Sequence, residues 1–457
     1  MNLFVKDKKF YSTICLIAFP VVFQNLITSG VNLMDTLMLT ECGELQLSAS
    51  SLANQFISMF QFMCMGMGYG AAVLTAQFWG ANDPLSIRKV TTLMLRVCVT
   101  LSLLFSFVTM AFPDKIMSIY TPDEEIIYQG VRYMRISGFT YLLHGLTLTL
   151  TAILRSVKEV RLPLITSIIA FFVNLFFNWM LIFGNLGAPR MEIEGAALGT
   201  LIARIVECGI IFVYFICLEK RIRYRLSDFF RSSSEYLRDY IRYCIPVLIS
   251  DTLLGLGNNI ISVIMGHIGA SFVSAFAIVS QLTRMTTVLT QGVSNSASVI
   301  TGNTLGEGNK KKAYEQGITF LTLAVILGIV VSIIIYLISP LVVYGCNLSE
   351  EAGRIAQQLL YSINITIVFS SVNSILTKGI LRGGGDTRFL MVADILFLWL
   401  ASVPLGYLTG LVWKCSAFVV YMALHIDWII KAIWCSLRLI QGKWVNNAVK
   451  AVESKAA

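Results

Sequence analysis

Charged residues are scarce in this chain. Asp, Glu, Lys and Arg make up 13% of its 457 residues, whereas about 25% is usual in a soluble domain. Hydrophobic residues make up 56% of the sequence, and the mean hydropathy is +0.74. So few charges would not cover the water-facing surface of a chain this long. The composition therefore excludes an ordinary soluble protein and indicates an integral membrane protein.

Residue patterns typical of catalysis are also lacking. The chain has three histidines and no His-rich motif, and the glycines at 383–385 lack the Lys-Ser/Thr pair that completes a phosphate-binding loop. Its ten cysteines are scattered singly, with neither metal-ligand spacing nor a disulfide framework. We therefore expect a protein that is not an enzyme and that uses no cofactor.

Long apolar runs, by contrast, are abundant. A helix needs about 20 predominantly apolar residues to cross a bilayer. Twelve segments meet this test, at 12–38, 51–78, 90–112, 126–154, 162–184, 193–218, 241–266, 274–302, 314–339, 353–380, 388–412 and 415–437. The predicted fold class is thus an all-α, multi-pass membrane protein with twelve transmembrane helices.

The net charge of +9 is distributed as a topology signal. Basic residues gather in alternate connections between the spans, while the opposite connections are acidic or nearly uncharged. The basic set is Arg88-Lys89, Arg155 to Arg161, the stretch 219–240, Lys310 to Lys312, Arg382 to Arg388 and the C-terminal tail. Since cytoplasmic connections carry the excess of Lys and Arg, we expect both termini in the cytoplasm, a location in the plasma (inner) membrane and no nucleic-acid partner.

The sequence also repeats itself. Pro20 and Pro246 stand 226 residues apart, and the same offset aligns Gly80 with Gly306. Further along, an offset of 227 aligns Arg155 with Arg382. Each copy holds six spans, so both copies enter the membrane in the same sense. We therefore expect two lobes related by a pseudo-two-fold axis along the membrane normal. The predicted parts are an N-terminal lobe at 1–218, a cytoplasmic linker at 219–240, a C-terminal lobe at 241–440 and a tail at 441–457.

Polar residues in the first copy point to an ion site. Ionisable groups inside the bilayer are costly and tend to mark function or to pair with one another. Asp35 lies in the first span, at a depth similar to that of Asn174, Asn178 and Thr200. Carboxylate, amide and hydroxyl oxygens suit Na⁺ or a proton relay. The alternative is a hydrogen-bonded cluster that holds the helices together.

The second copy carries different charges. Asp251 lies about ten residues into its span, near the bilayer midplane, and Asp394 enters the eleventh span. Arg284 has a depth similar to that of Asp251, so a buried Asp251–Arg284 pair is the competing interpretation. Within single spans we expect pairing between Arg204 and Glu207, and among His425, Asp427 and Lys431.

The charges are not duplicated although the scaffold is. Asp35 aligns with Ile261, and Asn178 aligns with Leu405, whereas the amides Asn258 and Gln281 do have counterparts in the first copy. We hypothesise that the lobes divide the work, with an ion site in one and a substrate or second ion site in the other. Pro20 and Pro246 are the expected helix kinks.

Taken together, the motifs resemble the multidrug and toxic compound extrusion (MATE) transporters over roughly residues 10–440. The resemblance is carried by AQFWGAND (76–83) with GNTLGEGN (302–309), LRSVKEVR (154–161) with LRGGGDTR (381–388), Pro20 with Asp35, and NLFFNWMLIFGNLG (174–187) leading to GAALGT (195–200). It implies two six-helix lobes around a V-shaped cleft. It also implies export of organic, often cationic and amphipathic, compounds driven by inward Na⁺ or H⁺.

The resemblance also assigns residues by position. Asp35 matches an acid that many members use for cation coupling, and it is where we expect Na⁺ if Na⁺ is the coupling ion. Asn174 and Thr200 match its polar partners, but Asn178 stands where well-studied relatives have aspartate. Asp251 resembles an acid on span 7. On span 10, where several members carry an acid, this chain offers Asn373.

The expected function is a cation-coupled antiporter that exports small organic cations by alternating access. The expected candidates in the second lobe are Asp251, Asp394, Arg284, Asn258, Gln281 and Asn373. We expect a monomer, because no oligomerisation signal stands out. The alternative is a flippase for lipid-linked oligosaccharides or lipids, which would be expected to line its cleft with several arginines to hold pyrophosphate.

Overall fold

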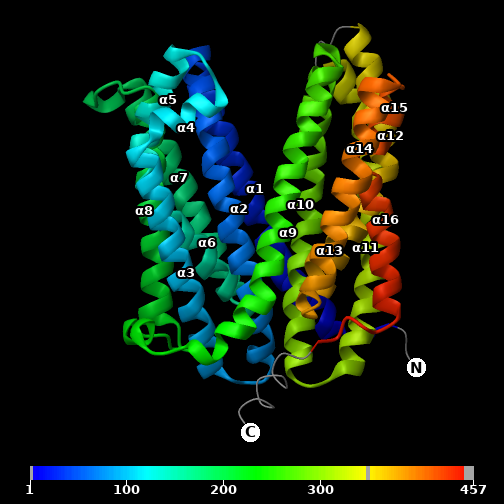
Figure 1. Cartoon of the computed structure of the whole chain (residues 1–457). Coiled ribbons are helices and arrows are strands. Elements are labelled where there is room, and N and C mark those ends of the chain that lie inside the picture. Colours follow the sequence, from blue (N-terminus) through cyan, green and yellow to red (C-terminus); the bar gives the residue numbers. More distant parts are fainter. Residues whose placement is uncertain (1–3, 346–349, 447–457) are drawn as a thin grey trace. The chain divides into compact units, whose positions relative to one another are not determined.

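The computed structural model describes residues 4–345 and 350–446, and all regular secondary structure in these residues is helical (Figure 1). The predicted all-α membrane fold class is confirmed. In chain order the elements are α1 (Lys8–Thr40), α2 (Glu44–Gly80), α3 (Pro84–Ala111), α4 (Pro113–Tyr120), α5 (Glu124–Ser137), α6 (Thr140–Ser156), α7 (Arg161–Phe183), η1 (Asn185–Gly187), α8 (Ile193–Val213), η2 (Tyr214–Leu218), η3 (Leu226–Phe230), η4 (Ser234–Tyr236), α9 (Leu237–Ile268), α10 (Ala270–Gly306), α11 (Lys310–Gly345), α12 (Glu350–Ser374), η5 (Ile375–Leu381), α13 (Thr387–Phe397), η6 (Leu398–Ser402), α14 (Val403–Tyr407), η7 (Leu408–Val412), α15 (Ala417–Leu424) and α16 (Ile426–Ile440).

The described part of the chain contains ten to twelve candidate membrane spans, against the twelve predicted. Ten helices are long and apolar enough to cross a membrane, and two bent pairs raise the number to twelve if each pair is one span. The pairs are α5 with α6, bent by 57°, and α15 with α16, bent by 41°. Both bends lie within segments that the sequence predicts as single spans, because hydropathy reports the length of an apolar run but not a break inside it.

The chain divides into two compact units. The C-terminal unit comprises Met1–Val22, Ala76–Asn82 and Ile249–Ala457, and the N-terminal unit comprises Phe23–Thr75 and Asp83–Leu248. Helices α1 and α9 each contribute to both units. In each, the boundary falls two residues after the proline inside the helix, Pro20 or Pro246. The lobe boundaries expected from the sequence, and the axis between the lobes, stay predictions.

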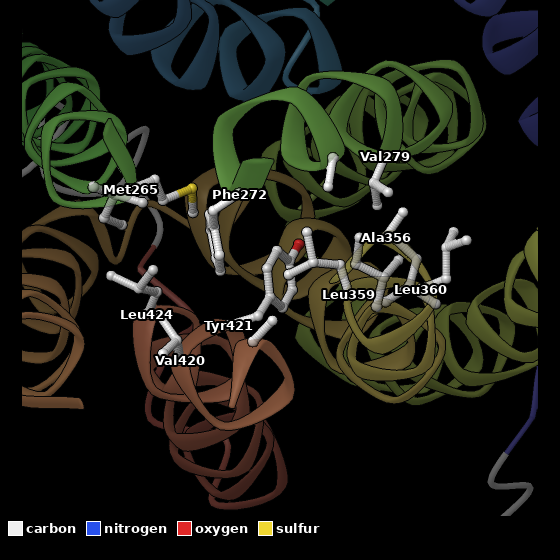
Figure 2. Close-up of a cluster of buried hydrophobic side chains, with 14 of the residues drawn as sticks. Met265, Phe272, Val279, Ala356, Leu359, Leu360, Val420, Tyr421 and Leu424 are labelled. Carbon is white, nitrogen blue, oxygen red and sulfur yellow. The ribbon is translucent and has the colours of Figure 1, made fainter. Parts of the chain in front are cut away.

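Each unit has its own apolar core. In the N-terminal unit, buried side chains of α2, α4, α5 and α8 meet around Ala53, Met117, Met134 and Ile193. In the C-terminal unit, α9, α10, α12 and α15 pack around Phe272, Leu359 and Tyr421 (Figure 2). Ile261, the counterpart of Asp35 in the second copy, is a buried member of this cluster. The position that carries a carboxylate in one repeat is therefore part of an apolar core in the other.

The predicted basic linker, residues 219–240, packs against α3 as a strap of short turns and extended chain. Arg88 donates from Nε to the Ile222 carbonyl at 2.6 Å, and Arg96 donates from Nε to the Phe229 carbonyl at 3.0 Å. The strap includes the short turns η3 and η4. The arginines of α3 thus donate hydrogen bonds to backbone carbonyls of the linker, which therefore do not stay unsatisfied.

The repeat is visible as a mutual contact between α2 and α10 within the C-terminal unit. A Cβ added at Gly80 would lie 1.9 Å from the Asn303 carbonyl oxygen, and a Cβ added at Gly306 would lie 1.9 Å from the Gln77 carbonyl oxygen. At the repeat offset of 226, Gly80 corresponds to Gly306 and Gln77 corresponds to Asn303. Each helix therefore needs a glycine at the same repeat position so that the backbone of the other can approach.

Candidate functional site

The four polar residues predicted in the first copy lie together in the N-terminal unit. Asn178 donates from Nδ2 to Asp35 Oδ1 at 2.5 Å and to Asn174 Oδ1 at 3.2 Å. Asn174 in turn donates from Nδ2 to Thr200 Oγ1 at 3.4 Å. A continuous chain of hydrogen bonds therefore joins α1, α7 and α8 through Asp35, Asn178, Asn174 and Thr200.

Local helix geometry explains this chain. Asn174 and Asn178 are four residues apart on α7, so their side chains lie on the same face of the helix. Gly199 lets α8 approach that face closely, because a Cβ at this position would lie 2.1 Å from Asn178 Oδ1. Asn178 is fully buried, and its Oδ1 has no hydrogen-bond partner among the described residues. Close packing against Gly199 on the Oδ1 side and hydrogen bonds from Nδ2 thus hold the amide in place, with its donor group directed at Asp35.

Asp35, Asn174 and Thr200 line a cavity of about 400 Å³ inside the N-terminal unit. Arg204 and Glu207 also line it, and they form the predicted pair, with Arg204 Nη1 2.5 Å from Glu207 Oε2. Asp35 accepts its hydrogen bond from the amide of Asn178, and no basic side chain within the described ranges forms an ion pair with it. With the Arg204–Glu207 pair neutral, the cavity carries one net negative charge, that of Asp35.

The cavity includes polar residues that the sequence reasoning missed. His144 is 8% exposed and lines the cavity, and its Nδ1 has no hydrogen-bond partner in the described part of the chain. Tyr133 also lines it and donates from its hydroxyl to Asn54 Oδ1 at 3.4 Å. His144 could have been found from the sequence, because it is an ionisable residue in the middle of an apolar run.

In the C-terminal unit, Asp251 pairs with Arg382 and not with Arg284. Arg382 Nη2 lies 2.8 Å from Asp251 Oδ1, and Nη1 lies 3.4 Å from Oδ2. Arg382 follows η5 in the connection to α13 and is 5% exposed, so this arginine is buried against Asp251. Arg284 is exposed on α10. The competing interpretation was therefore right that Asp251 is paired and wrong about the partner.

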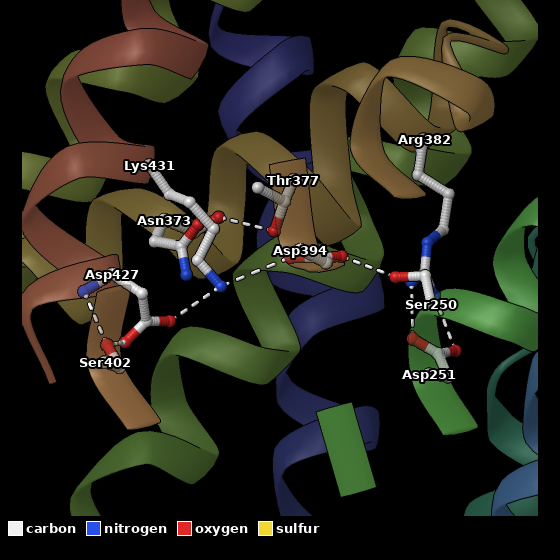
Figure 3. A network of polar contacts seen from close by, with 9 residues as sticks. All are labelled: Ser250, Asp251, Asn373, Thr377, Arg382, Asp394, Ser402, Asp427 and Lys431. Carbon is white, nitrogen blue, oxygen red and sulfur yellow. Dashed lines mark hydrogen bonds and ion pairs between the residues drawn. The ribbon is translucent and has the colours of Figure 1, made fainter. Parts of the chain in front are cut away.

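Asp394 belongs to a second buried network (Figure 3). Lys431 Nζ lies 3.2 Å from Asp394 Oδ1 and 2.9 Å from Asp427 Oδ2. Ser250 donates to Asp394 Oδ2 at 2.5 Å, and Ser402 donates to Asp427 Oδ1 at 2.8 Å. The predicted Asp427–Lys431 pair is thus present, and Asp394 joins it from α13.

The remaining candidates of the second copy do not gather into one site. Asn258 on α9 and Gln281 on α10 are exposed, while Asn373 on α12 is partly buried. Asn373 Oδ1 has no partner within the residues described, although its carbonyl accepts a hydrogen bond from Thr377 at 2.7 Å. His425 bonds the Tyr421 carbonyl through Nδ1 at 3.1 Å, in place of joining Asp427 and Lys431.

Metal chemistry of the Cys/His type finds no support in this arrangement. No group of three or more His, Cys, Asp or Glu residues that could hold a metal ion is present in the residues described. A monovalent cation at Asp35 would instead draw on one carboxylate with amide and hydroxyl oxygens, which are hard ligands.

Comparison with known proteins gives a consistent result. The MatE family profile matches the chain twice, at residues 20–180 and 246–408. A probable multidrug resistance protein NorM of Thermotoga maritima is 22% identical over 435 residues, covering 95% of this chain and 93% of the relative. The uncharacterized transporter YisQ of Bacillus subtilis is 22% identical and covers 90% of this chain and 87% of the relative.

Solved structures show the same fold. An outward-facing multidrug resistance MATE family transporter of the MOP superfamily superposes with a TM-score of 0.85 at 18% identity, covering 94% of this chain and 96% of that chain. A MOP superfamily transporter from Pyrococcus furiosus gives a TM-score of 0.84 at 18% identity, covering 94% and 96%. That protein is described as having a binding pocket of reversed polarity that suggests a different function.

The match of the family profile to both repeats and the names of the relatives place the chain in a class of secondary transporters. The chain belongs to the MatE family of multidrug and toxic compound extrusion transporters, since the family profile covers both repeats.

Proposed function

We propose that this protein exports small organic cations from the cytoplasm in exchange for Na⁺ or H⁺, and that Asp35 is the group that binds the coupling ion. The observation that carries the proposal is the state of the acids within the spans. Asp251, Asp394, Asp427 and Glu207 each have a basic partner. Asp35 has an amide partner instead.

One unpaired carboxylate is sufficient for exchange. A bound monovalent cation neutralises the charge of Asp35, and so does the positive group of an organic cation, but both cannot pair fully with one carboxylate. Each ligand therefore displaces the other, and alternating access converts this competition into antiport. Asn174 and Thr200 offer further oxygen atoms to Na⁺ beside Asp35, whereas a proton needs the carboxylate alone.

The substrate class is inferred from charge and from relatives. The cavity carries a net negative charge and mixes polar and apolar side chains, which suits an amphipathic cation. Several relatives are named as probable multidrug resistance proteins. We further propose that the chain lies in the plasma membrane with both termini in the cytoplasm, on the basis of the distribution of Lys and Arg, and that it acts as a monomer.

The flippase alternative gains no support from the arginines in the spans. Arg204 and Arg382 are occupied by Glu207 and Asp251, and Arg155 donates to Gln24 Oε1 at 2.5 Å. A pyrophosphate group would have to compete with these partners.

The test is transport in proteoliposomes. Uptake of a fluorescent organic cation is measured under an imposed Na⁺ gradient and, separately, under an imposed pH gradient. Asp35→Asn should abolish the gradient-dependent part, because it removes the charge and keeps the size of the side chain. Glu44→Gln, which neutralises an exposed carboxylate of the same unit, is the matched control and should transport normally.

Two results would contradict the proposal. Transport that ignores both gradients would exclude coupling, and full coupling in Asp35→Asn would place the ion elsewhere. If the folded protein moves no organic cation but translocates a fluorescent lipid-linked sugar, the flippase alternative is correct.

A further inference from the structure

The network around Lys431 has the composition of a cation site that is already filled. Lys431 lies on α16, is 2% exposed and reaches two carboxylates, Asp394 on α13 and Asp427 one turn before it. Figure 3 shows the ammonium group between the two acids, with Ser402 and Ser250 on their outer sides. An ordinary ion pair needs one acid for one base, but here two acids converge on one ammonium.

The oxygen atoms around Lys431 are those that would bind a free cation. Each carboxylate gives one oxygen to the ammonium group and uses the other to accept from a serine, Ser250 at 2.5 Å or Ser402 at 2.8 Å. The serines fix the orientation of both acids independently of the lysine. A hard cation placed at the Nζ position would therefore meet two preoriented carboxylate oxygens.

Counting charges explains why a free cation is not needed there. Besides Lys431, the charged side chains near this site include Asp251 and Arg382, which pair with each other, and Lys378 on η5, which interacts electrostatically with Asp251 and Asp394. Three acids and three bases sum to zero. The cavity of the N-terminal unit holds Asp35 and Glu207 against Arg204 and sums to minus one.

We propose that Lys431 is a built-in cation that occupies the Asp394–Asp427 site permanently, so that the C-terminal unit binds no free coupling ion. Lys431 thereby determines which half of the molecule couples. Its role in coupling rests on the proposed function, whereas its role as the occupant of the site does not. The proposal also reverses the expectation that Asp394 itself binds the coupling ion.

The test is cation binding, which does not require transport. Radioactive Na⁺ binding is measured on the purified full-length protein above about pH 8, where carboxyl groups are ordinarily ionised. Asp35→Asn, with Lys431 intact, should bind no Na⁺ at saturable stoichiometry. Asp35→Asn/Lys431→Met should bind one Na⁺ per chain, because the two buried acids are left without a counter-ion. Adding Asp427→Asn should abolish this binding again.

Each arm has a decisive outcome. Saturable Na⁺ binding in Asp35→Asn would overturn the proposal, because the C-terminal unit would then hold a free ion. A folded Asp35→Asn/Lys431→Met variant that binds no Na⁺ would overturn it as well. If that variant folds poorly, the Asp35→Asn arm still decides. If the wild-type protein binds no Na⁺ but the Lys431→Met variant does, the Na⁺ form of the proposed function fails while this inference stands.

Discussion

At the scale of single residues, Asn178 determines how many carboxylates the proposed ion site contains. Its Nδ2 lies 2.5 Å from Asp35 Oδ1, so Asn178→Asp would place a second carboxylate beside the first. Because two adjacent carboxylates repel unless a cation lies between them, we expect Na⁺ affinity to rise about tenfold, or about 1.4 kcal/mol. The measurement is the dissociation constant for Na⁺ on the purified protein.

Asn178→Leu is the matched control for this prediction. Leucine stands at the corresponding position of the second copy, Leu405, and it removes the hydrogen bond without adding charge. Na⁺ affinity should then fall below that of the wild-type protein. A lower affinity in Asn178→Asp than in wild type would show that the site takes no additional negative charge.

The sequence predicts the Asp35 network but misses the partners of Asp251 and Asp394. Comparing the depths of polar residues along the spans is enough to predict the partners of Asp35, because Asn174 and Asn178 share one helix face. For Asp251, Arg284 had a similar depth, but depth does not say which face of a helix a side chain occupies. The structure shows that equivalent arginines of the two repeats bond the kinked helix of their own copy, because Arg155 bonds Gln24 on α1 and its counterpart Arg382 bonds Asp251 on α9.

At the scale of elements, the crossing of α2 and α10 depends on two glycines. We expect Gly80→Ala and Gly306→Ala each to destabilise the protein by about 3 kcal/mol or more, beyond the usual cost of overpacking. The reason is that each new methyl group would meet a backbone carbonyl at 1.9 Å, and a carbonyl in a helix cannot move aside. Thermal unfolding of the purified variants measures the effect.

Gly209→Ala on α8 is the matched control. No atom lies within 4 Å of a Cβ added there, and alanine in a helix interior is favoured over glycine by about 0.5–1 kcal/mol. This variant should be as stable as the wild-type protein or slightly more so. If Gly80→Ala unfolds at the wild-type temperature, the close approach of the two helices does not limit stability.

Helix irregularities are the part of the elements that the sequence does not predict. The segments η5 and η6 are π-helical, and they carry residues of the C-terminal networks: Lys378 on η5, with Arg382 just after it, and Ser402 on η6. An extra residue per turn changes the face on which the following side chains lie, and no composition signal marks it. Such segments are frequent at functional sites.

At the scale of the whole molecule, charge counting predicts the electrical character of transport. One net negative charge in the cavity should be neutralised by one coupling cation or by one monovalent organic cation, so the exchange should be electroneutral. A membrane potential changes the free energy of transport by about 2.3 kcal/mol per net charge moved per 100 mV. An electroneutral cycle moves no net charge across the membrane, so the potential should not change its rate. Initial transport rates should be equal under inside-positive and inside-negative potassium diffusion potentials.

A rate that changes several-fold with the sign of the potential would show that the stoichiometry is unequal. The control is the same measurement with an ionophore that collapses the potential, which separates the effect of voltage from that of the potassium gradient. A divalent organic cation provides a further contrast, because its exchange for one coupling cation would move net charge.

For the molecule as a whole, the sequence predicts the spans from long apolar runs and the duplication from motifs that align at a fixed offset. The contrast between a charged cavity in one unit and a charge-balanced network in the other is only partly predictable from the sequence. The sequence showed that Asp35 aligns with Ile261 and that charges differ between copies. It could not show that the acids of the second copy are each met by a base, since those partners lie far apart in sequence.

The reciprocal contact between Gly80 and Asn303 and between Gly306 and Gln77 also has a consequence for the history of the protein. When position i of one copy touches position j of the other, and j touches i in return, the contact is that of a two-fold symmetric dimer. A half-length chain of six helices would carry both sides of this contact and would pair with an identical partner through it. Fusing two such chains would have released each copy from the need to remain identical, and the charges have since diverged while the two glycines have not.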